Sequence, residues 1–346
     1  MKDLCPDNIE TEEQLDDVLT RPSARLIEFI KSVSSPLLLL GAGGKMGPTL
    51  AALARRATEE AKHPLEVIAV SRFSDPQARE WVEKRGIRAT SCDLFNARDI
   101  ENLPDATSVI YLVGLKFGTA KNPSATWAAN TIIPTRIAER FAKSRIVALS
   151  TGNVYPLSEV KRGGSVETDA LTPVGEYANA AVARERVFEF HSRNEGIPIA
   201  LLRLFYAVEL RYGVLVDIAQ KVHRGEPIDL TNGYFNCIWQ SDANEMVIRA
   251  LSLCATPPSP WNLCRPEVFS TRNIATHLGQ LLDRVPKFIG SESSTALLGN
   301  SSPLCAQLGS PAVSADEMLP WIAGWVKRGG RNLNRPTHFE VRDGKY

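Results

Sequence analysis

Three glycines with a spacing suited to phosphate binding follow the first strongly apolar run of the chain. The run Pro36–Leu40 leads to Gly41, Gly44 and Gly47, and a helical pattern begins at Thr49. This order predicts a buried strand, a tight turn and a helix N-terminus. Glycines so spaced let the chain turn, let the backbone approach a pyrophosphate, and let the helix pack closely on its strand. The free N–H groups of the helix would then hold the phosphates of a dinucleotide.

Such a turn also occurs merely to pack a helix tightly on a strand, but dinucleotide binding is the favoured interpretation. The turn residues expected to contact the cofactor are Gly41, Gly43, Gly44, Lys45, Met46 and Gly47.

The end of the second expected strand, residues 65–70, bears on the choice between NAD and NADP. An acidic residue at this place binds the ribose hydroxyls of NAD, whereas a small residue beside an arginine accommodates the 2′-phosphate of NADP. Here the strand ends in Ser71 and Arg72. NADP is therefore preferred over NAD, with a solvated charge at a strand end as the alternative reading of Arg72.

Apolar strands alternate with helical segments along the first two thirds of the chain. Further strands are expected at residues 87–90, 108–113, 145–149 and 198–205, with a long helix at about 124–143. Parallel neighbours need helical crossovers, so this alternation predicts an α/β fold with a doubly wound parallel sheet. A ligand belongs at the carboxyl ends of such strands.

Composition limits the remaining possibilities. The 346 residues carry 40 basic and 39 acidic side chains, for a net charge of +1, which gives no reason to expect a nucleic-acid partner. Neither a membrane span nor a signal peptide is visible, so a cytoplasmic protein is expected. The six cysteines and five histidines lack the spacing of metal ligands, and no metal site is expected.

Several ordered motifs together resemble those of the extended short-chain dehydrogenase/reductases of the NAD-dependent epimerase/dehydratase family, over residues 36–285. They are the three glycines, Asp93-Leu94, Gly114, Asn130, the run Ser150-Thr-Gly-Asn-Val-Tyr155, and Tyr177 followed by Glu185. The resemblance implies a Rossmann-type domain at residues 36–205. Amphipathic patterns around residues 12–19 and 24–33 predict a helical extension at 1–35 before it. A smaller substrate-binding lobe with a C-terminal tail would occupy residues 206–346.

The resemblance also implies roles for individual residues. Asp93 would bond the adenine amino group, and Gly114 would let the cofactor pass; Leu94, Val113, Asn130 and Tyr177 complete the expected cofactor contacts. Tyr177 would be the acid/base, and Thr151 would orient the substrate hydroxyl, with Asn153 as a further substrate contact. A phenol has a pKa near 10, so it needs a nearby cation to act as a base at neutral pH.

The chain departs from the family at the residue that supplies this cation. The motif Y-x-x-x-K here reads Tyr177-Ala-Asn-Ala-Ala181, with alanine in place of the lysine. Two nearby cations are candidate replacements. Lys116 is preferred because it follows the fourth strand, whereas Arg184 is expected to point partly away from the cleft.

A second departure concerns the substrate. Where the family has an asparagine that helps hold a sugar nucleotide, this chain has Tyr206. The expected activity is NAD(P)-dependent oxidoreduction or epimerisation of a sugar, sugar acid or nucleotide sugar. The alternative is a non-catalytic NAD(P)-binding sensor that has lost its lysine. A small-molecule substrate is the expected partner, and a homodimer is left open. The tail after Gly329 is either disordered or docked, and its aromatic residues favour docking, with the substrate cleft as one place for it.

Overall fold

Seven parallel strands form the central sheet of the computed structural model, which describes residues 6–114, 122–335 and 337–344. The strand order is β12-β7-β5-β4-β1-β2-β3. Their bounds are β1 (Leu37–Leu40), β2 (Val67–Ser71), β3 (Arg88–Ser91), β4 (Ser108–Tyr111), β5 (Arg145–Thr151), β7 (Ile199–Leu204) and β12 (Ser259–Leu263). The chain moves outward from β1 in one direction and then, from β4, in the other, so the order reverses between β1 and β4. The expected α/β Rossmann-type fold is confirmed.

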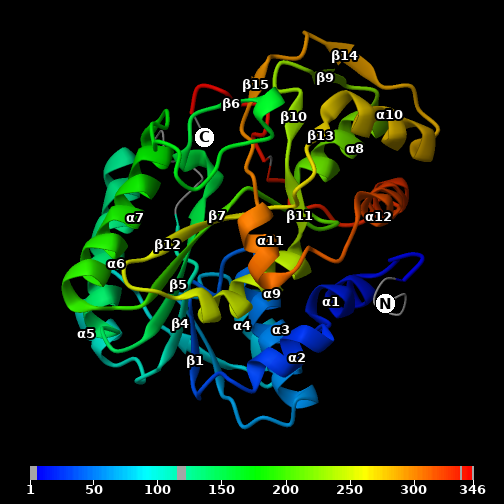
Figure 1. The fold of residues 1–346 in the computed structure, drawn as a ribbon. Coiled ribbons are helices and arrows are strands. Elements are labelled where there is room, and N and C mark those ends of the chain that lie inside the picture. The colour runs from blue at the N-terminus through cyan, green and yellow to red at the C-terminus, as the bar shows by residue number, and fades with distance from the viewer. Residues whose placement is uncertain (1–5, 115–121, 336, 345–346) are drawn as a thin grey trace.

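Both faces of the sheet are covered by helices, as Figure 1 shows. In β1, Leu37 and Leu39 belong to the core beneath α2, α3 and α9, whereas Leu38 and Leu40 belong to the core beneath α5, α6 and α7. A strand buried on both faces reads as a continuous apolar run, which is why β1 is four leucines. The helices concerned are α2 (Ala24–Ile30), α3 (Gly47–Glu60), α5 (Ala97–Glu101), α6 (Pro123–Arg140), α7 (Glu176–Glu195) and α9 (Gln240–Arg249). A further helix, α4 (Pro76–Glu83), lies between β2 and β3.

A smaller lobe stands beside the carboxyl ends of these strands (Figure 1). Its core is formed mainly by α8 (Val214–Arg224), α10 (Thr271–Leu282) and α12 (Ala315–Lys327). Short strands pair two by two around them: β6 (Ser158–Glu159) with β15 (Thr295–Ala296), β8 (Tyr206–Val208) with β11 (Cys237–Trp239), β9 (Pro227–Asp229) with β14 (Lys287–Ile289), and β10 (Tyr234–Phe235) with β13 (Phe269–Ser270). The helix α11 (Ser302–Leu308) packs against β12.

The boundary expected between residues 205 and 206 does not coincide with the sheet. After β11 the chain returns to the larger lobe, where α9 packs on α3 and β12 pairs in parallel with β7. The segment from α9 to β12 therefore packs with the larger lobe, where β12 completes the sheet, although it follows the first elements of the smaller lobe.

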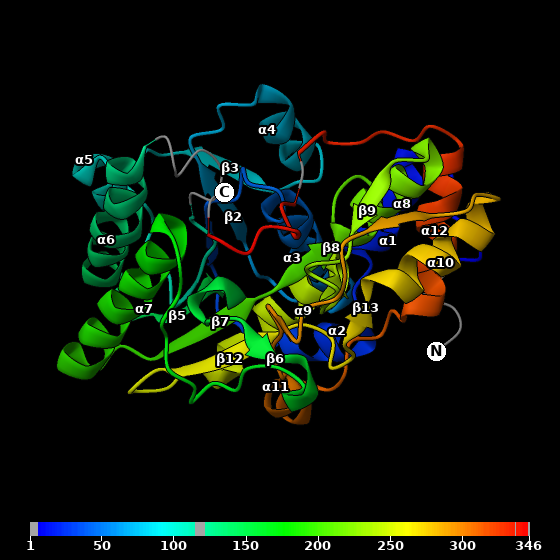
Figure 2. The same ribbon diagram turned by 90° about the horizontal axis from the view of Figure 1, so that it is seen from above.

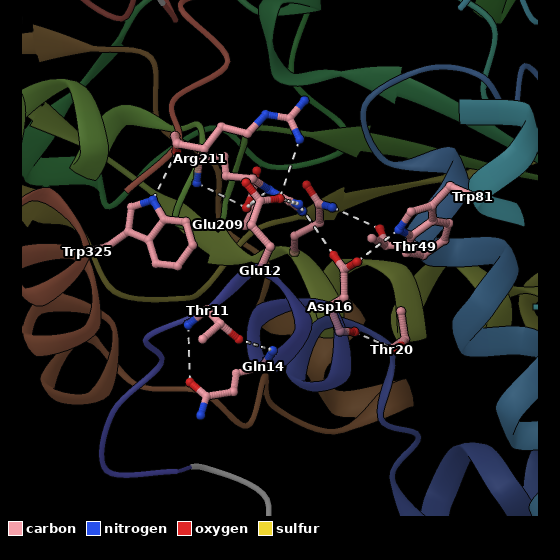
Figure 3. A network of polar contacts seen from close by, with 12 residues as sticks. Thr11, Glu12, Gln14, Asp16, Thr20, Thr49, Trp81, Glu209, Arg211 and Trp325 are labelled. Carbon is pink, nitrogen blue, oxygen red and sulfur yellow. Dashed lines mark hydrogen bonds and ion pairs between the residues drawn. The ribbon is translucent and has the colours of Figure 1, made fainter. Parts of the chain in front are cut away.

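The N-terminal extension joins the two lobes through α1 (Glu12–Thr20). Arg211 of the smaller lobe reaches Glu12 and Asp16 of α1 at 3.0 and 3.4 Å, while Asp16 also accepts a 2.9 Å bond from Trp81 of α4 (Figure 3). Arg211 pairs with the buried Glu209 as well, at 3.1 Å. This network fixes the backbone at residue 211, immediately before two residues that line the cleft described below. No helix in the described ranges is long and apolar enough to span a membrane.

Candidate active site

Two of the three glycines in the turn before α3 are required by the packing of the protein itself, and the third is not. Gly41 has φ +85°, and a Cβ there would lie 3.0 Å from Val113 Cγ2. A Cβ at Gly47 would lie 2.3 Å from Ala42 O, so only glycine lets the helix start so close to the turn. A Cβ at Gly44 would meet only Gly41 O, at an ordinary 3.4 Å. The protein itself therefore has room for a side chain at Gly44, and the open side of the turn is left for a ligand.

A cavity of about 260 Å³ lies between this turn, the ends of β4, β5 and β7, and the smaller lobe. Of the expected site residues, it is lined by Gly41, Gly44, Lys45, Met46, Gly47, Val113, Gly114, Thr151, Asn153, Tyr177 and Tyr206. The fold thus brings the glycine turn and the expected catalytic hydroxyls together, although they are more than 100 residues apart in sequence.

Tyr212 is a further tyrosine of the cavity that the sequence reasoning missed. It lines the cavity together with Tyr177 and Tyr206. Burial raises the pKa of Tyr212 to about 12, and nearby Asp217 and Tyr177 add to the shift. Its hydroxyl is therefore protonated at neutral pH. Tyr212 belongs to none of the family motifs found in the sequence. The one local feature that could have pointed to it is its place beside Gly213, at the start of α8.

The cavity wall is positively charged. Its two ionised side chains among the described residues are Lys45 and Arg184, and no Asp or Glu of the described chain lines it. Lys45 Nζ donates to Ala207 O at 2.8 Å and lies 4.1 Å from the centre of the Tyr212 ring, so it bridges the glycine turn and the smaller lobe. A concave positive surface suits an anionic ligand.

The position of Arg184 differs from the one expected from the sequence. It does not point away from the cleft but lines it, with only 3% of its surface exposed. Its Nη1 donates to Asn130 Oδ1 at 2.7 Å and to Val113 O at 3.2 Å. Helical side chains lean toward the N-terminus of the helix, so a long side chain at residue 184 reaches back along α7 toward its ligand-facing end. The other candidate cation, Lys116, lies outside the described residues.

The place of the missing lysine is apolar. Ala181 is fully buried and shares a core cluster with Phe205, Val154 and Leu297. The Phe205 ring fits only because Gly152 lacks a side chain: a Cβ there would lie 2.5 Å from the ring. A lysine at position 181 would have to enter this packed apolar cluster. The residues around position 181 are therefore suited to alanine and not to lysine.

Six of the expected cofactor residues lie outside the cavity itself. Ser71 stands beside Gly43, where an added Cβ would lie 2.6 Å from Ser71 Oγ. Arg72 is exposed at the strand end, which leaves it accessible to a ligand. Asn130 is fully buried behind the wall, where it donates to Thr126 O at 2.8 Å and accepts from Arg184. Its contact with a cofactor would therefore be indirect. The others are Gly43, Asp93 and Leu94.

A buried ion pair holds the helix of Tyr177 to β7, and a serine hydroxyl links the same carboxylate to the strand of Thr151. Arg203 of β7 binds both carboxylate oxygens of Glu185, with distances of 2.7 to 3.2 Å, and Ser150 donates to the same carboxylate at 2.5 Å. Arg203 also donates to Tyr155 Oη at 2.6 Å. Burial raises the pKa of Tyr155 to about 12, against the effect of Arg203, so this tyrosine stays protonated and structural. The network positions the cavity hydroxyls, and of its four described members only Ser150 lines the cavity.

We expect Arg203→Met to lower the free energy of unfolding by about 3–5 kcal/mol, because it leaves the Glu185 charge buried without a partner. Chemical denaturation would measure the loss. The double variant Arg203→Met/Glu185→Leu should recover much of it, since no uncompensated charge then remains. A single variant as stable as the unchanged protein would show that this ion pair does not hold the two elements together.

The C-terminal tail docks across the same cleft. Thr337 lines the cavity and donates to Asp217 of α8 at 2.6 Å through its hydroxyl. Phe339 is buried against Phe235. Near its end the tail reaches the start of α7, where a Cβ at Gly175 would lie 2.3 Å from Gly344 O. Figure 2 shows this segment, in red, passing from the smaller lobe toward the strand ends.

Comparison with known proteins agrees with this geometry. Residues 37–250 match the model of the NAD dependent epimerase/dehydratase family. The chain belongs to this family. The matched stretch contains the glycine turn, Thr151 and Tyr177, and it ends after α9, which packs on α3. A comparison with curated proteins found no significant match.

Several solved structures share the fold. UDP-glucuronic acid 4-epimerase from Bacillus cereus in complex with NAD has a TM-score of 0.70 at 17% identity, covering 85% of this chain and 99% of its own. UDP-glucose 4-epimerase from Thermotoga maritima with UDP-glucose has a TM-score of 0.67 at 17% identity, with coverages of 85% and 99%. RMD from Pseudomonas aeruginosa complexed with NADPH has a TM-score of 0.67 at 16% identity, covering 85% and 100%. At these identities the likeness establishes the fold.

Proposed function

We propose that this protein binds a nicotinamide dinucleotide, NADP in preference to NAD, and catalyses oxidoreduction or epimerisation of a sugar, sugar acid or nucleotide sugar. The observation that carries the proposal is that Tyr177 and Thr151 line one cavity with the glycine turn. A protein that merely binds the dinucleotide would need the glycine turn but would have no use for the Tyr177 and Thr151 pair. The open face at Gly44 and the positive wall fit the phosphates of that cofactor.

In the proposed reaction, the start of α3 and three side chains of the cavity each have a distinct role. The N–H groups at the start of α3 bind phosphate oxygens, and the positive end of the helix favours their charge. When bound, the nicotinamide supplies or accepts the hydride. Tyr177 gives or takes the proton of the reacting hydroxyl, and Thr151 holds that hydroxyl in place. Tyr212, protonated at neutral pH, donates a hydrogen bond to the substrate from the smaller lobe.

The wall of the cavity and the structural neighbours support the proposed substrate class. Structural neighbours include epimerases of UDP-sugars, one of them holding UDP-glucose. In this chain the smaller lobe presents Tyr206, Tyr212 and Thr337 to the cavity. These hydroxyls suit a polyhydroxylated ligand, while Tyr206 removes the amide that the family uses for a sugar nucleotide. Sugars and sugar acids therefore stay beside nucleotide sugars as candidates.

The test is incubation of the purified protein with NADP or NAD and a panel of sugars, sugar acids and UDP-sugars, with products separated by chromatography. We expect conversion of at least one member of the panel, and net redox change would also appear as absorbance at the wavelength of the reduced nicotinamide. Tight dinucleotide binding with no conversion of any member would favour the sensor alternative, which the loss of lysine at position 181 motivates.

We expect Arg72→Ala to weaken NADP binding by about one to two orders of magnitude while leaving NAD binding nearly unchanged. A guanidinium near a 2′-phosphate contributes roughly 1.5–3 kcal/mol through a charge-assisted bond. Titration calorimetry with both cofactors would measure it. Arg79→Ala is the matched control, because Arg79 is a nearby exposed arginine that pairs with Glu83 at 2.9 Å. Equal losses for NADP and NAD would contradict the assignment.

A further inference from the structure

Arg184 differs from the other buried arginines in what surrounds its charge. Three arginines of the described chain are buried: Arg184, Arg203 and Arg265. Arg203 pairs with Glu185 at 2.7 Å, and Arg265 pairs with Glu267 at 2.8 Å. Arg184 forms no ion pair with any described carboxylate and bonds only neutral oxygens, those of Val113 and Asn130. Its positive charge is buried without compensation.

The same guanidinium has unused hydrogen-bonding capacity. Arg184 Nε is buried and has no partner in the described structure. A buried charge is unfavourable unless it is paired, and a buried donor without an acceptor adds to that cost. Both costs fall when an anion with free oxygens enters the adjoining space. Since Arg184 lines the cavity, such an anion can reach it.

The contacts of Arg184 lead directly to the glycine turn. Its Nη1 lies 3.2 Å from the position that a Cβ of Gly114 would occupy, and it donates to the carbonyl of Val113. Val113 in turn packs on Gly41, whose added Cβ would lie 3.1 Å from Val113 N. The guanidinium and the phosphate-binding turn are therefore separated by a single strand end.

We propose that Arg184 binds a phosphate of the dinucleotide, as a cofactor-binding cation that this chain has on α7 in place of a lysine at position 181. The inference rests on the proposed function, because it requires a dinucleotide in this cavity. An arginine suits the role, since its planar fork matches phosphate oxygens and its charge is permanent. Its position, seven residues after Tyr177 on one helix, puts both side chains on the same face.

The experiment compares Arg184→Gln with Arg184→Lys and with the unchanged protein. Glutamine keeps a donor for Asn130 and Val113 but removes the charge, whereas lysine keeps the charge. Binding of ADP, NADP and NAD is measured by calorimetry, and thermal unfolding is followed with and without ligand. Arg186→Gln is the matched control, because Arg186 is an exposed arginine of the same helix that pairs with Glu189.

We expect Arg184→Gln to weaken ADP and NADP binding about 10- to 100-fold, the factor for one lost hydrogen bond to a charged group. Its ligand-free unfolding temperature should equal or exceed that of the unchanged protein, because a buried charge has been removed. Arg184→Lys should recover part of the affinity, and Arg186→Gln should change nothing.

Three results would overturn the inference. Unchanged ADP and NADP affinity in Arg184→Gln would show that Arg184 does not meet the dinucleotide. Weaker NADP with unchanged ADP would place its partner on the nicotinamide half instead of the shared phosphates. A large fall in ligand-free stability would show that the arginine is structural. If the unchanged protein bound none of the three ligands, the proposed function would fail, and this inference with it.

Discussion

Gly44→Val should abolish measurable binding of NADP and NAD while leaving the free energy of unfolding close to that of the unchanged protein. The side chain at this position would meet only Gly41 O, at 3.4 Å, so the protein has room for its first carbon. Its branches would occupy the face from which a pyrophosphate approaches the backbone. Loss of two charge-assisted bonds to phosphate would alone weaken binding by roughly a hundredfold or more. Calorimetric titration and chemical denaturation measure the two quantities.

Gly47→Ala should differ from Gly44→Val because it should affect stability as well as binding. Its Cβ would collide with the Ala42 backbone at 2.3 Å, so we expect it to lower both stability and cofactor affinity. Gly44→Ala should lie between the unchanged protein and Gly44→Val in affinity. Undiminished dinucleotide binding by Gly44→Val would show that the cofactor does not approach the turn at this residue.

Tyr177→Phe should lower turnover by about 10² to 10⁴, the usual contribution of a general acid or base, once a substrate has been found. Dinucleotide affinity should stay nearly the same, because the Tyr177 hydroxyl would supply only one of the many expected cofactor contacts. Steady-state kinetics and calorimetry on the same preparation would separate the two effects.

Tyr155→Phe and Tyr212→Phe are controls for this tyrosine. Tyr155 lies outside the cavity and binds Asn262 and Arg203, so its variant should lose stability more than turnover. Tyr212 lines the cavity but stays protonated, so its variant should raise KM more than it lowers kcat. A Tyr177→Phe enzyme that kept its rate would move the proton transfer to another group.

Most strands of the sheet could be predicted because each is recognisable from a short stretch of sequence. A run such as Leu37–Leu40 is apolar at every position, and this indicates a strand covered on both faces without knowledge of its neighbours. The turn at Gly41 could also be predicted, since each glycine lies in one short stretch. The return of β12 to the sheet was not predicted as such. Its run Ser259–Leu263 contains polar residues, and its partner β7 is about 60 residues away in sequence.

The electrostatics of the cavity depend on contacts that no local pattern contains. The sequence marks Arg184 as a candidate cation near Tyr177, but no local pattern shows that it is buried in the cavity wall, where it donates to Asn130 and Val113. Tyr212 lines the cavity next to Arg211, which is paired with α1, about 200 residues away in sequence. Gly152 and Gly299 leave room for the Phe205 ring between them. This ring fills the space beside Ala181, so packing there needs no lysine side chain.

A crystal structure of the protein grown with NADP would show directly whether the dinucleotide binds at the glycine turn. We expect one dinucleotide per chain, with its pyrophosphate at the N-terminus of α3 beside Gly44 and its nicotinamide directed toward Tyr177. We also expect a 2′-phosphate within hydrogen-bonding distance of Arg72. Saturating NADP that left this cleft without dinucleotide density, or density for the cofactor elsewhere on the molecule, would contradict the proposed site.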